Sequence, residues 1–370
     1  MTKRTLLALI LVASMLLSGC SLVMKDQAVD NKLTILEVDG EIVSKANFLS
    51  VYEYNVYMEE YYNSLMYSMF GTSSTVDTDA ILETTLADYI SAIVTTNKAA
   101  ELGFDKFTAE EEAALAVEVQ ADYEDNLTMV KDLYFAGSEL SAEELDTQVK
   151  QYAAANGLSL EQSQSTVRSS KISERLKASV TDLVTDVDDT ALQTLLDSKI
   201  ADEKTVYASS LGSFGASYNK GDLTYYTPAG YRTIRVIEVA KTEETAAAAN
   251  EEITALRARI ANGEAFDAIS ENIVTYVVCE SSTDVDANVV AAAMLLDTVG
   301  AVSPIVETAT GYAFAEYVGD IAESSAVLAD VRDLIYDEAL TNAKEAAYSD
   351  ALLKWQNEAD IKIYLENLSL

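Results

Sequence analysis

Hydrophobic and polar residues follow two periods along the chain, and the helical period dominates. From residue 45 to residue 205 apolar side chains recur every three or four positions, which is typical of amphipathic helices. The first long helix is predicted over residues 45–70, with its apolar positions at Phe48, Tyr52, Val56, Met58, Tyr62, Leu65 and Met69. Further helices are predicted from residue 77 or 79 to 102, from 108, from 141 to about 156, from 159 to about 184, and, shorter, from 188.

Capping residues mark the starts of two of these helices. Thr108 is followed three positions later by Glu111, and Ser141 is followed by Glu144 in the same way. This spacing is the signature of a capping box, in which the two side chains satisfy backbone N–H groups at the start of a helix.

The two ends of the fold are predicted to contain strands that meet. Residues 34–43 alternate around Asp39-Gly40, which indicates a short strand or a small hairpin. Residues 323–358 return to the helical period, and residues 361–365 then alternate as a strand. Because a lone terminal strand is unstable, we expect the C-terminal strand to pair with the one at residues 34–43.

The centre of the chain differs from the preceding helical segment in its glycine content and its hydrophobic pattern. Gly212, Gly215, Gly221 and Gly230 fall close together and indicate a boundary. After it, the pattern predicts a strand over 231–239, a helix ending at Gly263, a short helix, a strand over 273–278, a helix over 289–296 and strands on both sides of Gly311. The fold class is therefore predicted to be mainly α with a small α+β domain.

Composition excludes several functional classes. The 370 residues include 61 Asp and Glu against 25 Lys and Arg, which gives a net charge of −36 and repels nucleic acid. The sequence contains no histidine, so histidine triads and histidine metal sites are excluded. Its carboxylates follow no calcium-loop spacing. We expect no metal, no cofactor and no nucleic-acid partner.

The first residues have the pattern of a targeting signal. Lys3 and Arg4 precede an apolar run over residues 6–17, which is shorter than the about 20 residues that span a bilayer. Leu17-Ser18-Gly19-Cys20 then resembles the lipobox of bacterial lipoproteins. This resemblance implies a signal peptide over 1–19, lipidation of Cys20, a tether over 20–32 and an extracytoplasmic chain anchored to the bacterial cell membrane. Cys279 would then be the one remaining thiol, so no intramolecular disulfide is expected.

The layout resembles the PrsA and SurA type of extracytoplasmic foldase, which carries a parvulin-like peptidyl-prolyl cis-trans isomerase domain. The segments that carry this resemblance are 38–48, 97–103, 226–232, 261–269 and 299–312. The resemblance implies a helical chaperone-like domain over 33–205 and 322–370, a linker over 206–222 and an inserted parvulin-like domain over 223–321.

The sequence departs from the parvulin pattern where the family has two histidines. Val236 and Ala313 occupy those positions, and the family's Gly-Gly-Asp-Leu-Gly stretch is missing. The resemblance therefore implies weak isomerase activity or none.

Candidate catalytic residues by resemblance are Cys279, Thr308 and Thr310, and candidate peptide-pocket residues are Val236, Met294, Leu295 and Tyr312. For Cys279 the alternative is a buried strand position, because free cysteine is among the most buried residue types. For the two threonines the alternative is the polar face of a strand.

Tyrosine is abundant, with 21 residues in the chain, and several lie in the first long helix. Tyr54, Tyr57, Met58 and Tyr61 are candidates for a cleft that binds unfolded segments, because Tyr and Met make adaptable contacts with varied sequences. The alternative is that these side chains pack the helical core.

These observations favour an anchored foldase that binds unfolded or nascent secreted polypeptides, with the lipid bilayer and a homodimer as further partners. An active isomerase and a structural or solute-binding lipoprotein remain as alternatives. A solute receptor needs two lobes rich in βαβ units, and helices dominate this sequence.

Overall fold

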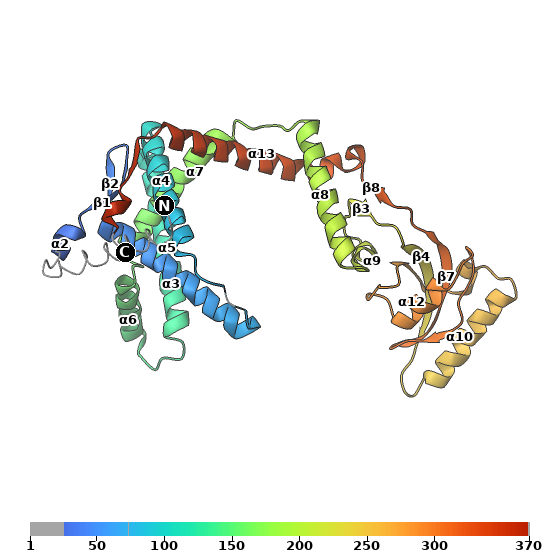
Figure 1. Ribbon diagram of the computed structural model, residues 1–370. Coiled ribbons are helices and arrows are strands. Elements are labelled where there is room, and N and C mark those ends of the chain that lie inside the picture. The colour runs from blue at the N-terminus through green and yellow to red at the C-terminus, as the bar shows by residue number, and fades with distance from the viewer. Residues whose placement is uncertain (1–25, 73, 369–370) are drawn as a thin grey trace, which may run out of the picture. The chain divides into compact units, whose positions relative to one another are not determined.

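The computed structural model describes residues 26–72 and 74–368 (Figure 1). The chain divides into two compact units, and each is described by itself. Unit 1 contains the residues up to Val184 and those from Lys344, and unit 2 is Thr185–Ala343. The chain is mainly α with a small α+β part, as the sequence predicts. Within the described ranges, no helix is both long and apolar enough to cross a membrane.

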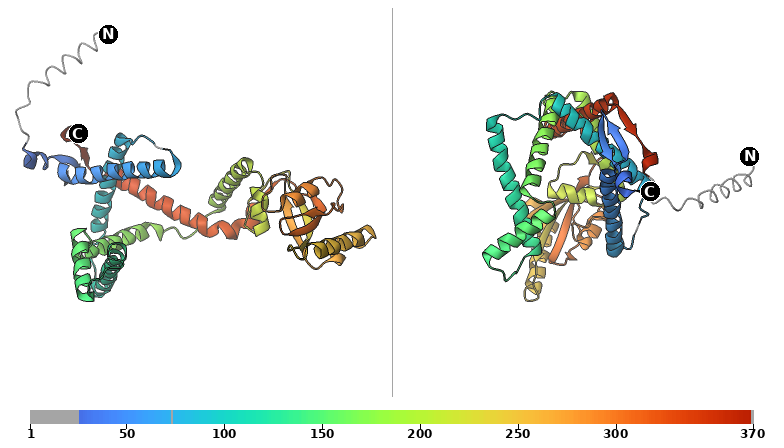
Figure 2. Two further views of the ribbon diagram at one scale, coloured as in Figure 1. Left: turned by 90° about the horizontal axis from the view of Figure 1, so that it is seen from below. Right: turned by 90° about the vertical axis from the view of Figure 1, so that its left-hand side faces the viewer.

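Unit 1 is built on helices whose starts follow the predicted caps. Its helices are α2 (Gln27–Asp30), α3 (Lys45–Phe70), α4 (Thr78–Glu101), α5 (Ala109–Tyr134), α6 (Ala142–Ala155) and α7 (Leu160–Thr181). Both capping boxes are present, at Thr108 with Glu111 and at Ser141 with Glu144. The short helix α2 lies inside the segment predicted as a tether. Figure 2 shows α5 in contact with both α6 and α7.

A three-stranded antiparallel sheet joins the two ends of the described chain in unit 1. Its order is β2 (Glu41–Ser44), β1 (Thr34–Val38), β9 (Ile361–Ile363). The turn between β1 and β2 uses Asp39 and Gly40, with φ angles of 51° and 86°. Val38 pairs with Ile361, so the predicted pairing of the terminal strands is confirmed. Ile35 and Leu36 of β1 and Phe48 of α3 are fully buried in one core cluster.

Unit 2 contains a helical part that the sequence reading underestimated. Its elements are α8 (Asp189–Ser209), α9 (Ser213–Lys220), the two-residue strands β3 (Tyr226–Thr227) and β8 (Ser324–Ser325), and the start of α13 (Leu328–Glu358). Helix α8 is longer than predicted, and it clusters with unit 2 and not with the preceding helices. Its buried Leu192 and Leu196 pack against Ile335 of α13.

Helix α9 lies in the segment predicted as a linker, and it is packed tightly. Phe214 is fully buried. A Cβ atom added to Gly215 would lie 2.6 Å from the carbonyl oxygen of Val277, so this glycine allows the helix to approach β5. The side chain of Asn219 bonds both backbone groups of Val277, at 2.7 and 3.0 Å. Gly215 therefore serves the close packing of α9 against β5.

The second sheet forms the α+β part of unit 2. Its antiparallel order is β5 (Ile273–Val278), β4 (Arg232–Ala240), β7 (Gly311–Asp320), β6 (Val306–Glu307). Helices α10 (Ala246–Ala261) and α11 (Phe266–Ile269) pack on the side chains of one face, including Ile237 and Phe314. Helix α12 (Ala287–Met294) packs on the other face, against Val236 and Ala313.

Candidate functional site

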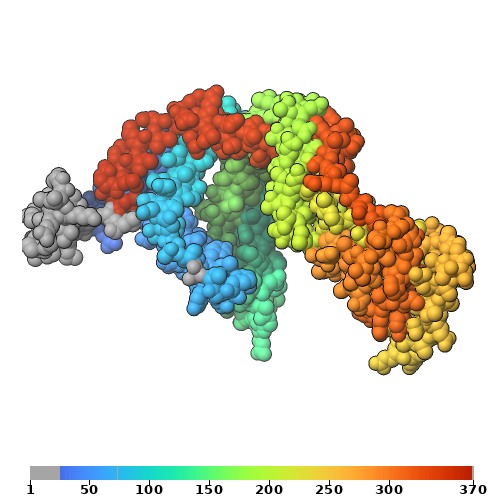
Figure 3. All heavy atoms as spheres, turned by 45° about the vertical axis from the view of Figure 1, so that its right-hand side comes forward, coloured from blue at the N-terminus to red at the C-terminus, as the bar shows by residue number. Residues whose placement is uncertain are grey.

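The part of α3 after Tyr52 carries an exposed apolar surface. Near its start the helix packs into the core through Phe48 and Tyr52, which are 0% and 7% exposed. Beyond this point nine of its large apolar side chains are 41–64% exposed, whereas Val56 and Met58 are half-buried. We call this set the α3 surface, and its members are Tyr54, Tyr57, Tyr61, Tyr62, Leu65, Met66, Tyr67, Met69 and Phe70. In Figure 3 this part of α3 lies at the surface of unit 1.

The exposure follows from where α4 begins. The hydroxyl of Tyr52 donates to the carbonyl of Thr78, at 3.4 Å, so the start of α4 lies beside the Tyr52 position of α3. The remainder of α3 extends past that point (Figure 1). Ser74, in the connection back to α4, donates to the side chain of Asn63 at 2.7 Å. The helix thus continues beyond the neighbour that buries its first half.

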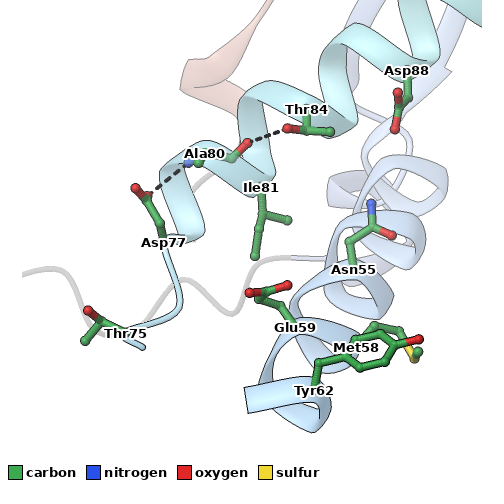
Figure 4. A pocket seen from close by; sticks show the side chains of 10 residues that line it. All are labelled: Asn55, Met58, Glu59, Tyr62, Thr75, Asp77, Ala80, Ile81, Thr84 and Asp88. Atoms are coloured by element: carbon green, nitrogen blue, oxygen red, sulfur yellow. Dashed lines mark hydrogen bonds between the residues drawn. The ribbon is translucent and has the colours of Figure 1, made fainter. Parts of the chain in front are cut away.

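A groove of about 480 Å³ lies between α3 and α4 (Figure 4). Asn55, Met58, Glu59 and Tyr62 line it from α3, and Thr75, Asp77, Ala80, Ile81, Thr84 and Asp88 line it from the other side. The lining residues within α3 and α4 recur about three or four positions apart, which places them on one face of each helix, and Thr75 and Asp77 precede α4. Asn55 also donates to Thr85 of α4, at 3.1 Å, and this hydrogen bond holds the two helices together at the groove.

The cleft residues predicted from sequence fall into two places. Met58 lines the groove, whereas Tyr54, Tyr57 and Tyr61 lie on the exposed α3 surface at 60%, 60% and 52% exposure. They do not pack the helical core. Sequence reasoning missed the polar lining of the groove, especially Glu59. The sequence signal that could have identified Glu59 is its spacing, four positions after Asn55 and three before Tyr62, which places the three on one face of a helix.

The residues predicted to form a peptide pocket are separated in unit 2. Val236 is 5% exposed and lies in the core beneath α12, and Met294 packs against that core. Leu295 is 84% exposed just after α12. Tyr312 packs on the opposite face of the sheet, with Phe314. The structure brings Val236 and Met294 together, and it does not bring Leu295 or Tyr312 to them.

Thr308 and Thr310 converge on a carboxylate that sequence reasoning missed. Their hydroxyls lie 2.6 and 2.7 Å from Oε1 of Glu238 on β4, to which both donate. The Thr308 oxygen also accepts the backbone N–H groups of Thr310 and Gly311. A hydroxyl proton held by this carboxylate is not available to a substrate carbonyl.

Cys279 lies elsewhere in unit 2. It packs beneath α9, beside the cluster of Tyr207, Phe214, Tyr231 and Val277. The backbone N–H of Cys279 donates to the hydroxyl of Ser282 at 2.9 Å. Burial, and secondly the hydrogen bond with Cys279, raise the pKa of Tyr231 to about 12. Cys279 is therefore not brought together with Val236, Thr308 or Thr310.

No group of three or more acidic or cysteine side chains is arranged to hold a metal ion anywhere in residues 26–72 and 74–368. Cys20, the predicted lipidation site, lies outside the described residues, as does the whole predicted signal peptide.

Comparison with known proteins gives matches among solved structures. No protein-family model matches the sequence, and no curated protein matches it. A structure of the SurA-like chaperones PEB4 and Cj1289 of Campylobacter jejuni is 10% identical, with a TM-score of 0.31, and the match covers 90% of this chain and 98% of that one.

Two foldase structures match at similar coverage. The foldase PrsA of Streptococcus pneumoniae is 16% identical over 91% of this chain and 97% of that one, with a TM-score of 0.22. PrsA of Bacillus subtilis is 16% identical over 92% and 98%, with a TM-score of 0.24. Identity and TM-score at this level carry no argument about activity. These matched structures are of PrsA foldases and SurA-like chaperones, the type that the sequence resembles.

Proposed function

We propose that this protein assists the folding of secreted proteins by binding their unfolded segments on unit 1. The observation that carries the proposal is the α3 surface, where tyrosine, methionine, leucine and phenylalanine side chains stand exposed on one helix. Contiguous apolar surface of this kind on a soluble protein marks an interaction site. The proposal rests on this surface and not on the likeness to solved structures.

The chemistry of the α3 surface suits ligands of varied sequence. Tyrosine offers a large apolar ring together with a hydroxyl that bonds backbone groups, and methionine adapts its shape to different partners. Such surfaces give broad binding with modest specificity. An unfolded chain, which exposes apolar side chains and unpaired backbone groups together, is the ligand that fits.

We further propose that the chain acts outside the cytoplasm, held to the membrane through a lipid on Cys20. The support is the lipobox Leu17-Ser18-Gly19-Cys20 after a short apolar run. Replacing Cys20 with serine should release the protein from membranes in folded form. Continued sedimentation of this variant with membranes would contradict the anchor.

The α+β part of unit 2 is proposed to have weak isomerase activity or none. The sequence contains no histidine, and Val236 and Ala313, at the two histidine positions of the family, are buried under α12. The hydroxyls of Thr308 and Thr310 are engaged by Glu238. These features leave peptide binding as the activity that we assign.

Refolding assays test the proposal. The Cys20→Ser protein is added to several unrelated unfolded proteins, and to one whose slow refolding phase is limited by a proline bond. We expect a higher yield of folded protein at an unchanged slow-phase rate. A faster slow phase would show a working isomerase, and no change in either quantity would leave a structural lipoprotein.

A surface variant shows whether α3 is responsible. Tyr54, Tyr57 and Tyr61 are replaced with serine, which should remove most of the gain in yield with little change in stability, because all three are exposed. The matched control replaces exposed Leu183, Leu211 and Tyr218, outside α3 and α4, with serine. Equal loss in both variants would exclude a specific role for the α3 surface.

A further inference from the structure

The groove between α3 and α4 combines apolar lining with carboxylates. Met58, Tyr62 and Ile81 contribute its apolar side chains. Glu59, Asp77 and Asp88 line it as well, and Figure 4 shows them placed around Ile81. Asp77 also caps α4 by accepting the backbone N–H of Ala80 at 3.0 Å. A segment lying on Ile81 would therefore have carboxylates beside it.

The segment that lines the groove carries no positive charge. From Ala46 to Asn97 the sequence has no lysine and no arginine, but it has seven aspartate or glutamate residues. The ion pairs found in the described chain involve neither Glu59 nor Asp88. Elsewhere in unit 1 carboxylates do have cationic partners, as Glu112 has Arg168 at 2.9 Å. The groove thus presents uncompensated negative charge next to apolar side chains.

We propose that this groove selects unfolded segments in which lysine or arginine flanks aliphatic or aromatic residues. The inference rests on the proposed function and names its substrate class. The apolar stem of a lysine or arginine can lie along Ile81 and Met58 while its charged end reaches Glu59 or Asp88. An acidic segment of equal apolar content is repelled by the same carboxylates.

Charge also argues against a second copy of this chain as the occupant. A copy carries a net charge of −36, and its own α3 and α4 would bring further carboxylates to the groove. Like charges brought together across an interface oppose association. A cationic segment from another protein is the complementary ligand.

Binding of matched peptides tests the selectivity. Three labelled peptides share the same leucine and phenylalanine positions and differ only in carrying lysine, serine or glutamate between them. Fluorescence anisotropy with the Cys20→Ser protein should show binding in the order lysine, serine, glutamate. Two exposed ion pairs predict a difference of roughly three- to tenfold between the lysine and serine peptides, which weakens in high salt.

Two double variants distinguish the effect of the groove carboxylates from the effect of the overall charge. Glu59→Gln with Asp88→Asn removes two groove carboxylates, and Glu60→Gln with Glu83→Gln removes the same charge from exposed positions that do not line the groove. We expect the lysine preference to vanish in the first variant and to persist in the second. Glu59→Lys should shift the preference toward the glutamate peptide.

The outcomes distinguish the two proposals. If no peptide binds, the proposed function itself fails. If all three bind equally, or if both double variants lose the preference equally, peptide binding stands and the selectivity of the groove is overturned. Self-association of the protein that the groove variant abolishes would instead make a second copy the occupant. The fluorescence of Trp355, the single tryptophan, which packs in the core of unit 1, checks that each variant is folded.

Discussion

The hydroxyl of Thr308 donates a hydrogen bond of 2.6 Å to the carboxylate of Glu238, across the end of the sheet in unit 2. Thr310 donates to the same oxygen. The two hydroxyl groups that resemblance to a prolyl isomerase suggests as catalytic therefore already have a hydrogen-bond partner within the protein. Beneath α12, the same face of the sheet is filled by Val236, Ala313 and their neighbours.

This packing predicts that restoring histidines will not restore an isomerase. Val236→His with Ala313→His would place two large polar rings at positions that are 5% and 0% exposed. Overpacking of this kind costs roughly 1–3 kcal/mol at each site. We expect a lower melting temperature and no faster proline-limited refolding. The control is Val274→His with Val318→His, at positions 48% and 40% exposed, which should fold normally. A gain of isomerase activity in the first variant would show that an open pocket can form there.

Arg232 is predicted to hold the C-terminal end of α12. Its Nη1 lies 3.1 Å from the carbonyl oxygen of Ala293 and 2.8 Å from that of Leu296, to which it donates. Its guanidinium also lies over the ring of Tyr317, at 4.6 Å from the ring centre. Arg232→Met should lower the free energy of unfolding by about 1–3 kcal/mol, because carbonyl groups lose their donor. Chemical denaturation measures this change. Arg332→Met, which removes an exposed pair with Asp189, should have a much smaller effect, and equal effects would contradict the assignment.

The terminal strand β9 is predicted to be essential for unit 1. Ending the chain after Asp360 removes the pairing of Val38 with Ile361 and the burial of Leu368, which is 4% exposed. Loss of one buried leucine and of the edge hydrogen bonds should cost roughly 3 kcal/mol or more. Urea unfolding followed by Trp355 fluorescence reports this loss, because Trp355 packs against the same core. Lys362→Gln, which removes only exposed ion pairs of β9, should unfold almost as the unchanged protein does.

The capping box of α5 predicts a pH dependence. The backbone N–H of Thr108 donates to Glu111 at 2.7 Å and holds the pKa of that carboxyl below its usual value, and the Thr108 hydroxyl and Arg175 lower it further. A pKa lowered by folding stabilises the fold above the unfolded value, about 4.3, and this stabilisation is lost as the pH falls through the folded value. Glu111→Gln should therefore lower the melting temperature at pH 7, and the difference should shrink as the pH falls below about 4.3.

Glu110→Gln is the matched control for this prediction, because it removes the same charge from the same helical turn. Its melting temperature should stay close to that of the unchanged protein across the pH range. If the difference between Glu111→Gln and the unchanged protein is constant from pH 7 to pH 3, the capping carboxylate does not act through its charge.

The sequence alone determined most helix boundaries, because the signals that start and stop a helix are local. Thr108 and Ser141 cap their helices through residues three positions away, and nothing distant is needed to read them. The pairing of the two terminal strands was also accessible, because a single unpaired strand must find a partner.

Tertiary structure decided which apolar faces are covered. The helical period of α3 continues from Phe48 to Met69, yet only its first part is buried, because α4 begins opposite Tyr52. Periodicity shows that a helix has an apolar face but does not show whether a neighbour packs on it. The same limit applies to the linker prediction: the glycines near Gly215 indicate a boundary in the sequence, whereas in the fold Gly215 permits α9 to approach β5.

The separation of the candidate pocket residues has a related cause. Val236 and Tyr312 belong to adjacent strands, but their side chains project to opposite faces of the sheet. The register between the two strands determines this separation. Cys279 lies in a different cluster from Val236 for the same reason. Residue type and spacing along one strand determine which side chains share a face of that strand. Which faces of different strands and helices meet depends on long-range pairing, and that was decided only by the tertiary structure.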